Sequence, residues 1–536
     1  MSSKSSSRNQ RLLHLMLHAL RSPAPILWLV VALLGGLFYL AVAAWGYGVS
    51  GFPLDDAWIH QTYARNLGQT GQWAFVPGQP SAGSTAPLWS LLLSVGYGLR
   101  LPFLAWTYGL GIFCLGLTGW TVARLGARLF PAQPQLGLWA GLFCVLEWHL
   151  IWAAVSGMET GLFIWLSTLL VERYLAWQPL AAAPETKNPK RETQDLWLGL
   201  LGSLLILTRP EGIGLVGLVG LDLAYREWRR RGSFRAVLRR WVWLAVGVGL
   251  LLLPYVGFHL WLTGQPLPNT FYAKQAEYRL VLTSFPLWWR LFGNFGPPVE
   301  TVQGVFRVIF IGAPALLLPG LVAAAGLTLK ERRGELVIIW AWWIGHLLLY
   351  GLRLPVTYQH GRYQLPVLPW VILLGIWGTV RLLANSRRQR LMLRVVGRAL
   401  GLSLPLVVIA FGVIGAQAYG RDVRFIDGEM VAVARWLNAH TEPEALLAAH
   451  DIGAIGYFTQ RPLIDLAGLI TPEVIPIIRD EAALLKFIRA RQADYLVTFP
   501  DWYPTLTQNP ALTKIYSTEA PGDPMTVYRL KSKPVY

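Results

Sequence analysis

The sequence predicts a polytopic α-helical membrane protein of about eleven transmembrane helices, followed by a C-terminal soluble α/β domain, and three observations support this fold class. The 536 residues are 54% hydrophobic and only 14% charged, with 26 Trp, whereas a soluble chain needs more charge to cover its surface. Apolar runs near the length of a membrane-spanning helix recur through residues 26–420. After residue 420 the pattern changes to short alternating helical and strand segments.

The apolar runs set the number of spans. The N-terminal segment 1–25 is polar and basic, and the uncharged run after it is too long for a signal-peptide core, so we expect a retained first span. Two short runs within 196–225 are interpreted as a hairpin of two short helices. The candidate spans are 26–46, 104–123, 136–155, 161–177, 196–207, 213–225, 241–261, 305–328, 335–351, 365–383 and 399–418.

The basic residues orient these spans. With the N-terminus in the cytoplasm, the cytoplasmic segments hold 26 of the 47 Lys and Arg, the outer loops hold 9, and the segment after Tyr419 holds 12. This asymmetry follows the positive-inside rule, and it indicates a multi-pass protein of the cell membrane whose C-terminal domain is extracytoplasmic. The net charge of +18 is therefore a topological signal, and nucleic acid is excluded as a partner.

The first outer loop, residues 47–103, is too long and polar to be a simple connector. Asp55 and Asp56 open it and precede an amphipathic helix over 57–67, and 88–99 predicts a second helix at the membrane surface. Adjacent carboxylates can supply a general base together with a metal ligand or an orienting group. The alternative is that Asp55 caps the following helix and Asp56 interacts with its dipole.

Other polar groups fall on the same outer side. They lie in the turn 156–160, at the hairpin tip 208–212, and in the loops 267–274 and 358–363. Arg, Lys and Tyr donors there would suit a lipid-linked phosphate, which Arg can bind with two parallel hydrogen bonds. Two alternatives remain open: the cations extend to the lipid headgroups, or Arg209 and Glu211 pair only with each other.

The C-terminal segment predicts a small three-layer α/β unit. Helices are expected over 430–439, 452–458 and 481–491, and strands over 445–449, 462–466, 493–499, 514–517 and 526–530. His450 and Asp451 follow the first of these strands, at the end where α/β folds place their sites. A structural role for His450 is the alternative.

Several of these segments resemble the GT-C glycosyltransferases, nearest the arm that contains the mycobacterial terminal arabinofuranosyltransferases. The resemblance rests on 55–57 and 63–67, then on 78–80 and 87–89, all in the first outer loop. It continues through 208–212, 267–274 and 362–366, and covers most of 26–420. One departure is that 83–87 reads Gly-Ser-Thr-Ala-Pro, where arabinosyltransferase-like sequences tend to carry an aromatic residue and Asn, so arabinose is not assumed.

The resemblance implies that 26–420 is a GT-C-like catalytic domain and 421–536 an extracytoplasmic domain. The protein would be an inverting glycosyltransferase that moves a sugar from a polyprenyl-phosphate donor to a cell-envelope glycan, lipid or protein acceptor. Asp55 or Asp56 would be the general base, with Asp55 preferred, and whether a divalent metal ion takes part is left open. The expected donor and phosphate site consists of Arg65, Arg209, Glu211, Asn269, Tyr272, Lys274, His360 and Arg362.

The rival hypothesis is a transporter or a flippase for lipid-linked sugars, which would also place charges in a membrane cavity. Such proteins often show repeat symmetry between their halves, and this sequence shows none. The charges singled out above also lie in outer loops rather than in the middle of spans. Both observations favour the transferase.

Overall fold

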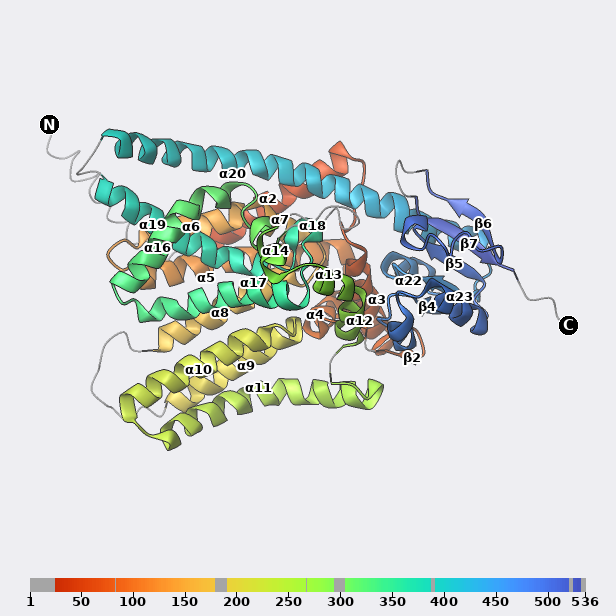
Figure 1. Ribbon diagram of the computed structural model, residues 1–536, viewed down its shortest axis with the longest axis horizontal. Helices are drawn as coiled ribbons and strands as arrows, with labels where there is room; N and C mark the ends of the chain where they lie inside the picture. Colours follow the sequence, from red (N-terminus) through yellow and green to blue (C-terminus); the bar gives the residue numbers. More distant parts are fainter. Residues whose placement is uncertain are drawn as a thin grey trace.

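The computed structural model describes residues 25–81, 83–178, 190–266, 268–293, 304–386, 391–519 and 524–531. A helical bundle forms most of the elongated molecule, and a small domain containing a sheet lies at one end (Figure 1). The expected cytoplasmic N-terminus lies outside the described residues except for Pro25. Parts of two expected basic loops, 179–189 and 387–390, also lie outside them.

Long apolar helices build the bundle, as the hydropathy of their sequences predicts. They are α2 (Pro25–Ala41), α5 (Phe103–Leu129), α6 (Gln135–Leu146), α7 (Trp148–Val155), α8 (Thr160–Trp177), α9 (Lys190–Thr208), α10 (Gly212–Arg231), α11 (Phe234–Thr263), α16 (Leu318–Lys330), α17 (Val337–Arg353), α19 (Leu368–Ser386) and α20 (Leu391–Ile426). The expected hairpin is present as α9 and α10, joined by a tight turn at 209–211. Helices α9, α10 and α11 lie along one side of the bundle (Figure 1).

Seven helices among the described residues are long and apolar enough to cross a membrane, or eight if a bent pair is one span. The chain is therefore a multi-pass membrane protein, while the number of eleven spans stays a prediction. Two expected spans differ in detail. The run 136–155 is broken before Trp148 into α6 and α7, which are bent by 54°, and Glu147 at the break caps α7 by accepting the backbone N–H of Leu150. The run 305–328 becomes a span only from Ala313.

The first outer loop forms α3 (Asp55–Thr70), a short hairpin of β1 (Ala74–Val76) and β2 (Gln79–Pro80), and α4 (Pro87–Gly98). Pro87 starts α4, where its missing N–H is not needed. We expected α3 to lie on the membrane surface with one exposed face. Instead nearly all of it from Asp55 to Asn66 is buried, because it lies between the bundle and the C-terminal domain.

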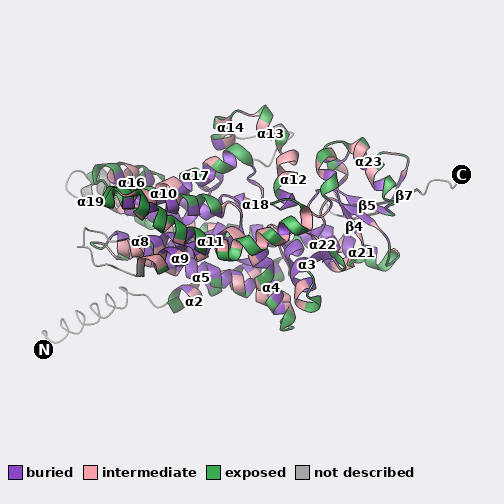
Figure 2. Ribbon diagram, turned by 90° about the horizontal axis from the view of Figure 1, so that it is seen from below, coloured by how far each residue is buried: buried purple, intermediate pink, exposed green. Residues whose placement is uncertain are grey.

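Shorter outer helices complete this junction. They are α12 (Asn269–Glu277), α13 (Arg279–Ser284), α14 (Leu287–Phe292), α15 (Val305–Val308) and α18 (Tyr358–Gly361). Figure 2 shows α13 and α14 standing away from the bundle, with α12 and α18 nearer the C-terminal domain. The loops predicted to be outer, which keep the name outer loops below, thus gather at the end of the bundle that faces the sheet.

Helix α20 runs the length of the bundle and enters the C-terminal domain (Figure 1). That domain contains α21 (Ala432–His440), β3 (Leu447–Ala449), α22 (Gly453–Thr459), β4 (Leu463–Asp465), α23 (Glu481–Ala490), β5 (Tyr495–Thr498), β6 (Leu512–Ser517) and β7 (Thr526–Leu530). The strand order is β4-β3-β5-β7-β6, and β3 pairs in parallel with both β4 and β5. Every helix and strand expected in this segment is present. The parallel arrangement brings the C-terminal ends of β3, β4 and β5 to one edge.

Candidate functional site

A cavity of about 1470 Å³ lies where the outer loops meet the C-terminal domain. Asp55 and Asp56 from α3 contribute to its walls, and so do the hairpin tip and α12. Further walls come from α9, α11 and α17, from the segments 83–87 and 158–159, from the start of the span at 358–363, and from the strand ends of the C-terminal domain. Of the expected site residues, the cavity is lined by Asp55, Asp56, Arg209, Glu211, Lys274 and Arg362.

Three cations surround the ring of Tyr363. The guanidinium carbons of Arg209 and Arg362 lie 4.9 Å and 4.8 Å from the ring centroid. The amine of Lys274 lies 4.9 Å from the same centroid and donates a hydrogen bond to the Tyr363 hydroxyl. Three outer segments far apart in the sequence thus place positive charge around one aromatic side chain, where cation–π attraction offsets part of their mutual repulsion.

Among the three cations, Arg362 is the one with hydrogen-bond donors that have no partner among the described residues. Its Nη2 donates to the Asp56 carboxylate and to the Tyr363 hydroxyl, the latter at 2.9 Å. Its Nε and Nη1 are buried and have no hydrogen-bond partner among the described residues. A buried guanidinium with two free donors is a site for an anionic ligand, because leaving those donors unsatisfied is unfavourable.

The backbone before Arg362 is strained. Gln359, His360 and Gly361 all have φ between 55° and 68°, a region that non-glycine residues rarely occupy. His360 holds this turn by lying 2.8 Å from the Asp422 carboxylate of α20 and packing against Trp148 and Trp152. Such strain persists only where surrounding contacts enforce it, and it is often found at functional sites. His360 therefore supports the turn that presents Arg362, and it does not line the cavity itself.

Arg209 has partners for all three of its nitrogen atoms. It donates to Glu159 and Glu211, each at 2.6 Å, and to the Tyr350 hydroxyl at 3.0 Å. The expected pairing of Arg209 with Glu211 is present, but the two do not pair only with each other, because Arg209 also binds Glu159. Its charge is compensated by two carboxylates, so Arg209 has less capacity for a ligand than Arg362.

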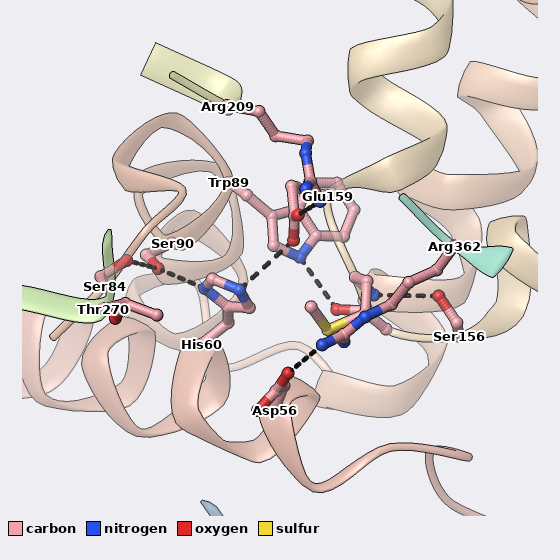
Figure 3. A network of polar contacts seen from close by, with 12 residues as sticks. Asp56, His60, Ser84, Trp89, Ser90, Ser156, Glu159, Arg209, Thr270 and Arg362 are labelled. Carbon is pink, nitrogen blue, oxygen red and sulfur yellow. Dashed lines mark hydrogen bonds and ion pairs between the residues drawn. The ribbon is translucent and has the colours of Figure 1, made fainter. Parts of the chain in front are cut away.

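A chain of polar side chains extends from Arg209, as Figure 3 shows, and its members Glu159 and His60 line the cavity. Glu159 lies 3.4 Å from Nε2 of His60, whose Nδ1 lies 3.1 Å from the Ser90 hydroxyl. Ser90 in turn lies 3.0 Å from Ser84. The sequence reasoning missed His60, although it stands four residues after Asp56 and so shares its helix face.

Asp55 connects the two domains. Its carboxylate accepts the backbone N–H groups of Gly453 at 2.7 Å and Ala454 at 2.8 Å, at the start of α22. It does not act as the cap of its own helix, since Leu54 occupies that position without a side-chain hydrogen bond. Asp56 points the other way and keeps 37% of its side chain exposed while it pairs with Arg362.

The two neighbouring carboxylates have opposite electrostatic environments. Burial raises the pKa of Asp55 to about 7, an effect to which Asp56 adds and which the two backbone hydrogen bonds only partly oppose. Burial alone would also raise the pKa of Asp56, but the charges of Arg362 and Lys274 outweigh it and hold that pKa far below its usual range. Asp56 is therefore ionised at neutral pH, and Asp55 can exchange a proton near neutrality.

Three further expected site residues lie outside the cavity lining. Arg65 donates to the backbone oxygen of Tyr457 at 2.5 Å and lies over that ring. Asn269 donates to the backbone oxygen of Leu469 at 3.1 Å, and the ring of Tyr272 packs against Phe271. Two of these contacts, those of Arg65 and Asn269, join outer loops to the C-terminal domain.

The described residues contain no group of three or more His, Cys, Asp or Glu side chains arranged to hold a metal ion. Among these residues, the structure therefore identifies no set of ligands for the divalent metal ion whose participation the sequence left open.

Solved structures with similar folds were compared with this chain. ArnT from Cupriavidus metallidurans in the apo state aligns with a TM-score of 0.56 and 16% identity, over 95% of this chain and 98% of that chain. The archaeal oligosaccharyltransferase AglB from Archaeoglobus fulgidus, in complex with an inhibitory peptide and a dolichol-phosphate, aligns with a TM-score of 0.57 and 12% identity, over 88% and 69%. The chain has the GT-C fold. The predicted resemblance is thereby confirmed at the level of the fold.

The arm within the GT-C fold is less sharply defined. The arabinofuranosyltransferase AftD from Mycobacteria aligns with a TM-score of 0.48 and 15% identity, over 95% of this chain and 42% of that chain. A score this low does not rank one GT-C arm above another. The family model for a domain of unknown function, DUF8728, matches residues 428–528, the C-terminal domain. A search of curated proteins found no significant match.

Proposed function

We propose that this protein is an inverting glycosyltransferase that moves a sugar from a polyprenyl-phosphate donor to an acceptor on the outer face of the membrane. The observation that carries the proposal is the buried Arg362, with two unsatisfied donors beside Lys274 and Asp56 in one cavity. Two structures with the same fold support the donor class. ArnT from Cupriavidus metallidurans is known bound to undecaprenyl phosphate, and AglB with a dolichol-phosphate.

Arg362 and Lys274 receive the donor phosphate in this proposal. Nε and Nη1 of Arg362 bind its oxygens, and the amine of Lys274 adds a second charge. As the bond between the anomeric carbon and the phosphate oxygen breaks, negative charge on the phosphate grows, and preorganised cations stabilise that change. Arg209 does not bind the phosphate directly, because all its donors are occupied, and it supports the site through its contacts with Tyr363 and Glu159.

Asp55 takes the proton from the acceptor hydroxyl. The hydroxyl oxygen attacks the anomeric carbon from the face opposite the phosphate, the new glycosidic bond inverts the configuration, and polyprenyl phosphate leaves with the bonding electrons. A base with a pKa near 7 suits this role at neutral pH. Asp56 keeps Arg362 oriented and stays ionised.

The test uses the full chain in lipid nanodiscs with a panel of polyprenyl-phosphate sugars and a total envelope extract as the acceptor source. We expect free polyprenyl phosphate to appear together with a glycosylated product, and we expect both to fall in Arg362→Lys. A flippase would instead move the intact donor across proteoliposomes without cleaving it. Transbilayer movement with no cleavage of any donor would show that the proposed function is wrong.

A further inference from the structure

One wall of the cavity belongs to the C-terminal domain and has its own chemistry. Its polar and aromatic members are His450, Asp451, Arg479, Glu481, Asp501, Trp502 and Tyr503, and the apolar Ile452, Ala467, Leu469 and Ile478 lie among them. His450 and Asp451 directly follow β3, while Trp502 and Tyr503 follow β5 by a few residues. Because β3 and β5 are adjacent and parallel, their C-terminal ends open at the same edge, which is where α/β sheets bind ligands.

The aromatic and imidazole groups of this wall hold one another in place. Nδ1 of His450 lies 2.6 Å from the Tyr503 hydroxyl. The His450 ring meets Trp502 edge to face at 4.8 Å between centroids, and Phe499 supports Trp502 from a centroid distance of 5.0 Å. Trp502 nevertheless keeps 48% of its surface exposed. A half-exposed indole that lines the cavity offers part of its aromatic face to a ligand.

Asp451 supplies an unsatisfied acceptor beside that face. Its Oδ2 is buried and has no hydrogen-bond partner among the described residues. Two residues further on, the N–H of Gly453 is bound by Asp55, so Asp451 lies next to the proposed base. Burial, together with the charges of Asp55 and Asp56, raises the pKa of Asp451, so its carboxyl group favours the neutral form. A hydroxyl bound to Asp451 is therefore close to the carboxylate that would deprotonate the acceptor.

We propose that this wall is the acceptor subsite and that the acceptor is a carbohydrate. The inference rests on the proposed function and specifies its substrate class. A sugar ring combines an apolar face of C–H groups, which packs on an indole, with hydroxyls that hydrogen-bond to a carboxyl group. A lipid tail would leave the buried Oδ2 of Asp451 without a hydrogen bond, which is unfavourable.

Binding is measured separately from transfer. Full-length protein in fluorescent nanodiscs is applied to an array of hexose, pentose and aminosugar oligosaccharides, with hydroxylated peptides and glycerophospholipids as separate spots. We expect oligosaccharide spots to retain the protein. Trp502→Ala and Asp451→Asn should each weaken retention about tenfold or more, the effect of losing about 1.4 kcal/mol of binding free energy. Ile515→Ala, a truncation of an exposed residue on β6 outside the cavity, is the matched control and should change nothing.

Native mass spectrometry of undecaprenyl phosphate on the same samples separates the two proposals. Three results would overturn the acceptor subsite while lipid-phosphate binding leaves the donor site standing. They are empty oligosaccharide spots, retention on peptide or lipid spots alone, and oligosaccharide retention that is unchanged in Asp451→Asn. Asp451→Asn is nearly isosteric, so this arm holds even if Trp502→Ala misfolds. Oligosaccharide retention without lipid-phosphate binding overturns the donor site instead. Failure of both ligands overturns both proposals.

Discussion

The carboxylate of Asp55 accepts the backbone N–H of Gly453 at 2.7 Å, although 398 residues separate them. A carboxylate at the mouth of the membrane bundle is thereby tied to the first turn of α22. One residue thus has two tasks, the proposed proton transfer and the docking of the C-terminal domain. Substitution of Asp55 alone would mix the two effects, so the predictions below separate them.

Gly453→Ala should disturb docking without removing the carboxyl group of Asp55 from the chain. A Cβ at this position would lie 2.0 Å from the backbone oxygen of Asp55, so the two segments must move apart. We expect a destabilisation of about 1–3 kcal/mol, as for other overpacked contacts, seen as faster hydrogen exchange in α22. Gly428→Ala is the control, because a Cβ there meets no atom within 4 Å. In Asp55→Asn, the rate of sugar transfer should fall by a further factor of roughly 10²–10⁴. If Asp55→Asn and Gly453→Ala lose the same amount of activity, Asp55 only docks the C-terminal domain.

The pH dependence of kcat/KM should report Asp55. Its pKa is raised to about 7, so the basic form is lost as the pH falls below neutrality and kcat/KM should fall with it. Asp56→Asn removes a charge that helps to raise this pKa, so the acidic limb of its residual activity should shift to lower pH. The linkage to stability has the opposite sense: a raised carboxyl pKa favours the folded state at acidic pH, and that contribution is lost as the pH rises through about 7. An acidic limb unmoved by Asp56→Asn would contradict the assignment.

Arg362→Lys tests the shape of the phosphate site. Lysine keeps the charge but not the planar fork whose Nε and Nη1 are unsatisfied. We expect undecaprenyl phosphate to bind more weakly and kcat/KM to fall roughly 10²-fold, the scale of one lost transition-state donor. Arg65→Lys is the matched control, because Arg65 contacts Tyr457 outside the cavity and its change should leave lipid-phosphate affinity unaltered. If Arg362→Lys keeps wild-type binding and activity, the alternative that Arg362 only extends to the lipid headgroups is favoured.

Arg209→Gln should act mainly on stability. Its side chain bonds to Glu159 and Glu211, and its removal takes the arginine away from both carboxylates and leaves Glu159 only His60, at 3.4 Å. Breaking a buried ion pair in this way costs about 3–5 kcal/mol, which thermal unfolding in detergent would detect. Glu211→Gln, which keeps the Arg209–Glu159 pair, should be milder. A stable Arg209→Gln variant with weak undecaprenyl phosphate binding would move Arg209 into the phosphate site.

The orientation in the membrane is tested by single-cysteine labelling of intact cells. Gln79→Cys and His440→Cys should react with an impermeant reagent, whereas Arg235→Cys should react only after permeabilisation. All three positions are exposed in the structure, and the native Cys114 and Cys144 are buried, which keeps the background low. If only Arg235→Cys reacts in intact cells, the topology is the reverse of the predicted one.

The sequence predicted some of the residues that line the cavity from their chemical character, without information on their positions in space. Lys274 and Arg362 were expected at one phosphate because they lie in outer loops beside aromatic residues, and both line the cavity with Asp55 and Asp56. Arg65, Asn269, Tyr272 and His360 carried the same local signal but do not line it. Which polar side chain of a loop faces a ligand depends on how that loop packs against segments hundreds of residues away, and no local pattern encodes this.

The sequence by itself determined most of the apolar helices, the hairpin at 196–225, and the α-helices and strands of the C-terminal domain, because hydrophobic periodicity follows directly from which face is removed from water. It did not predict the short 3-10 helices over Pro472–Ile477 and Pro500–Trp502. Tertiary structure alone decided that α3 is buried on both faces, that Asp55 caps α22 and that Tyr363 stands among three cations. It also gave two adjacent aspartates opposite pKa shifts. Burial and nearby charge set those shifts, and both come from segments that meet only when the outer loops and the C-terminal domain close over the end of the bundle.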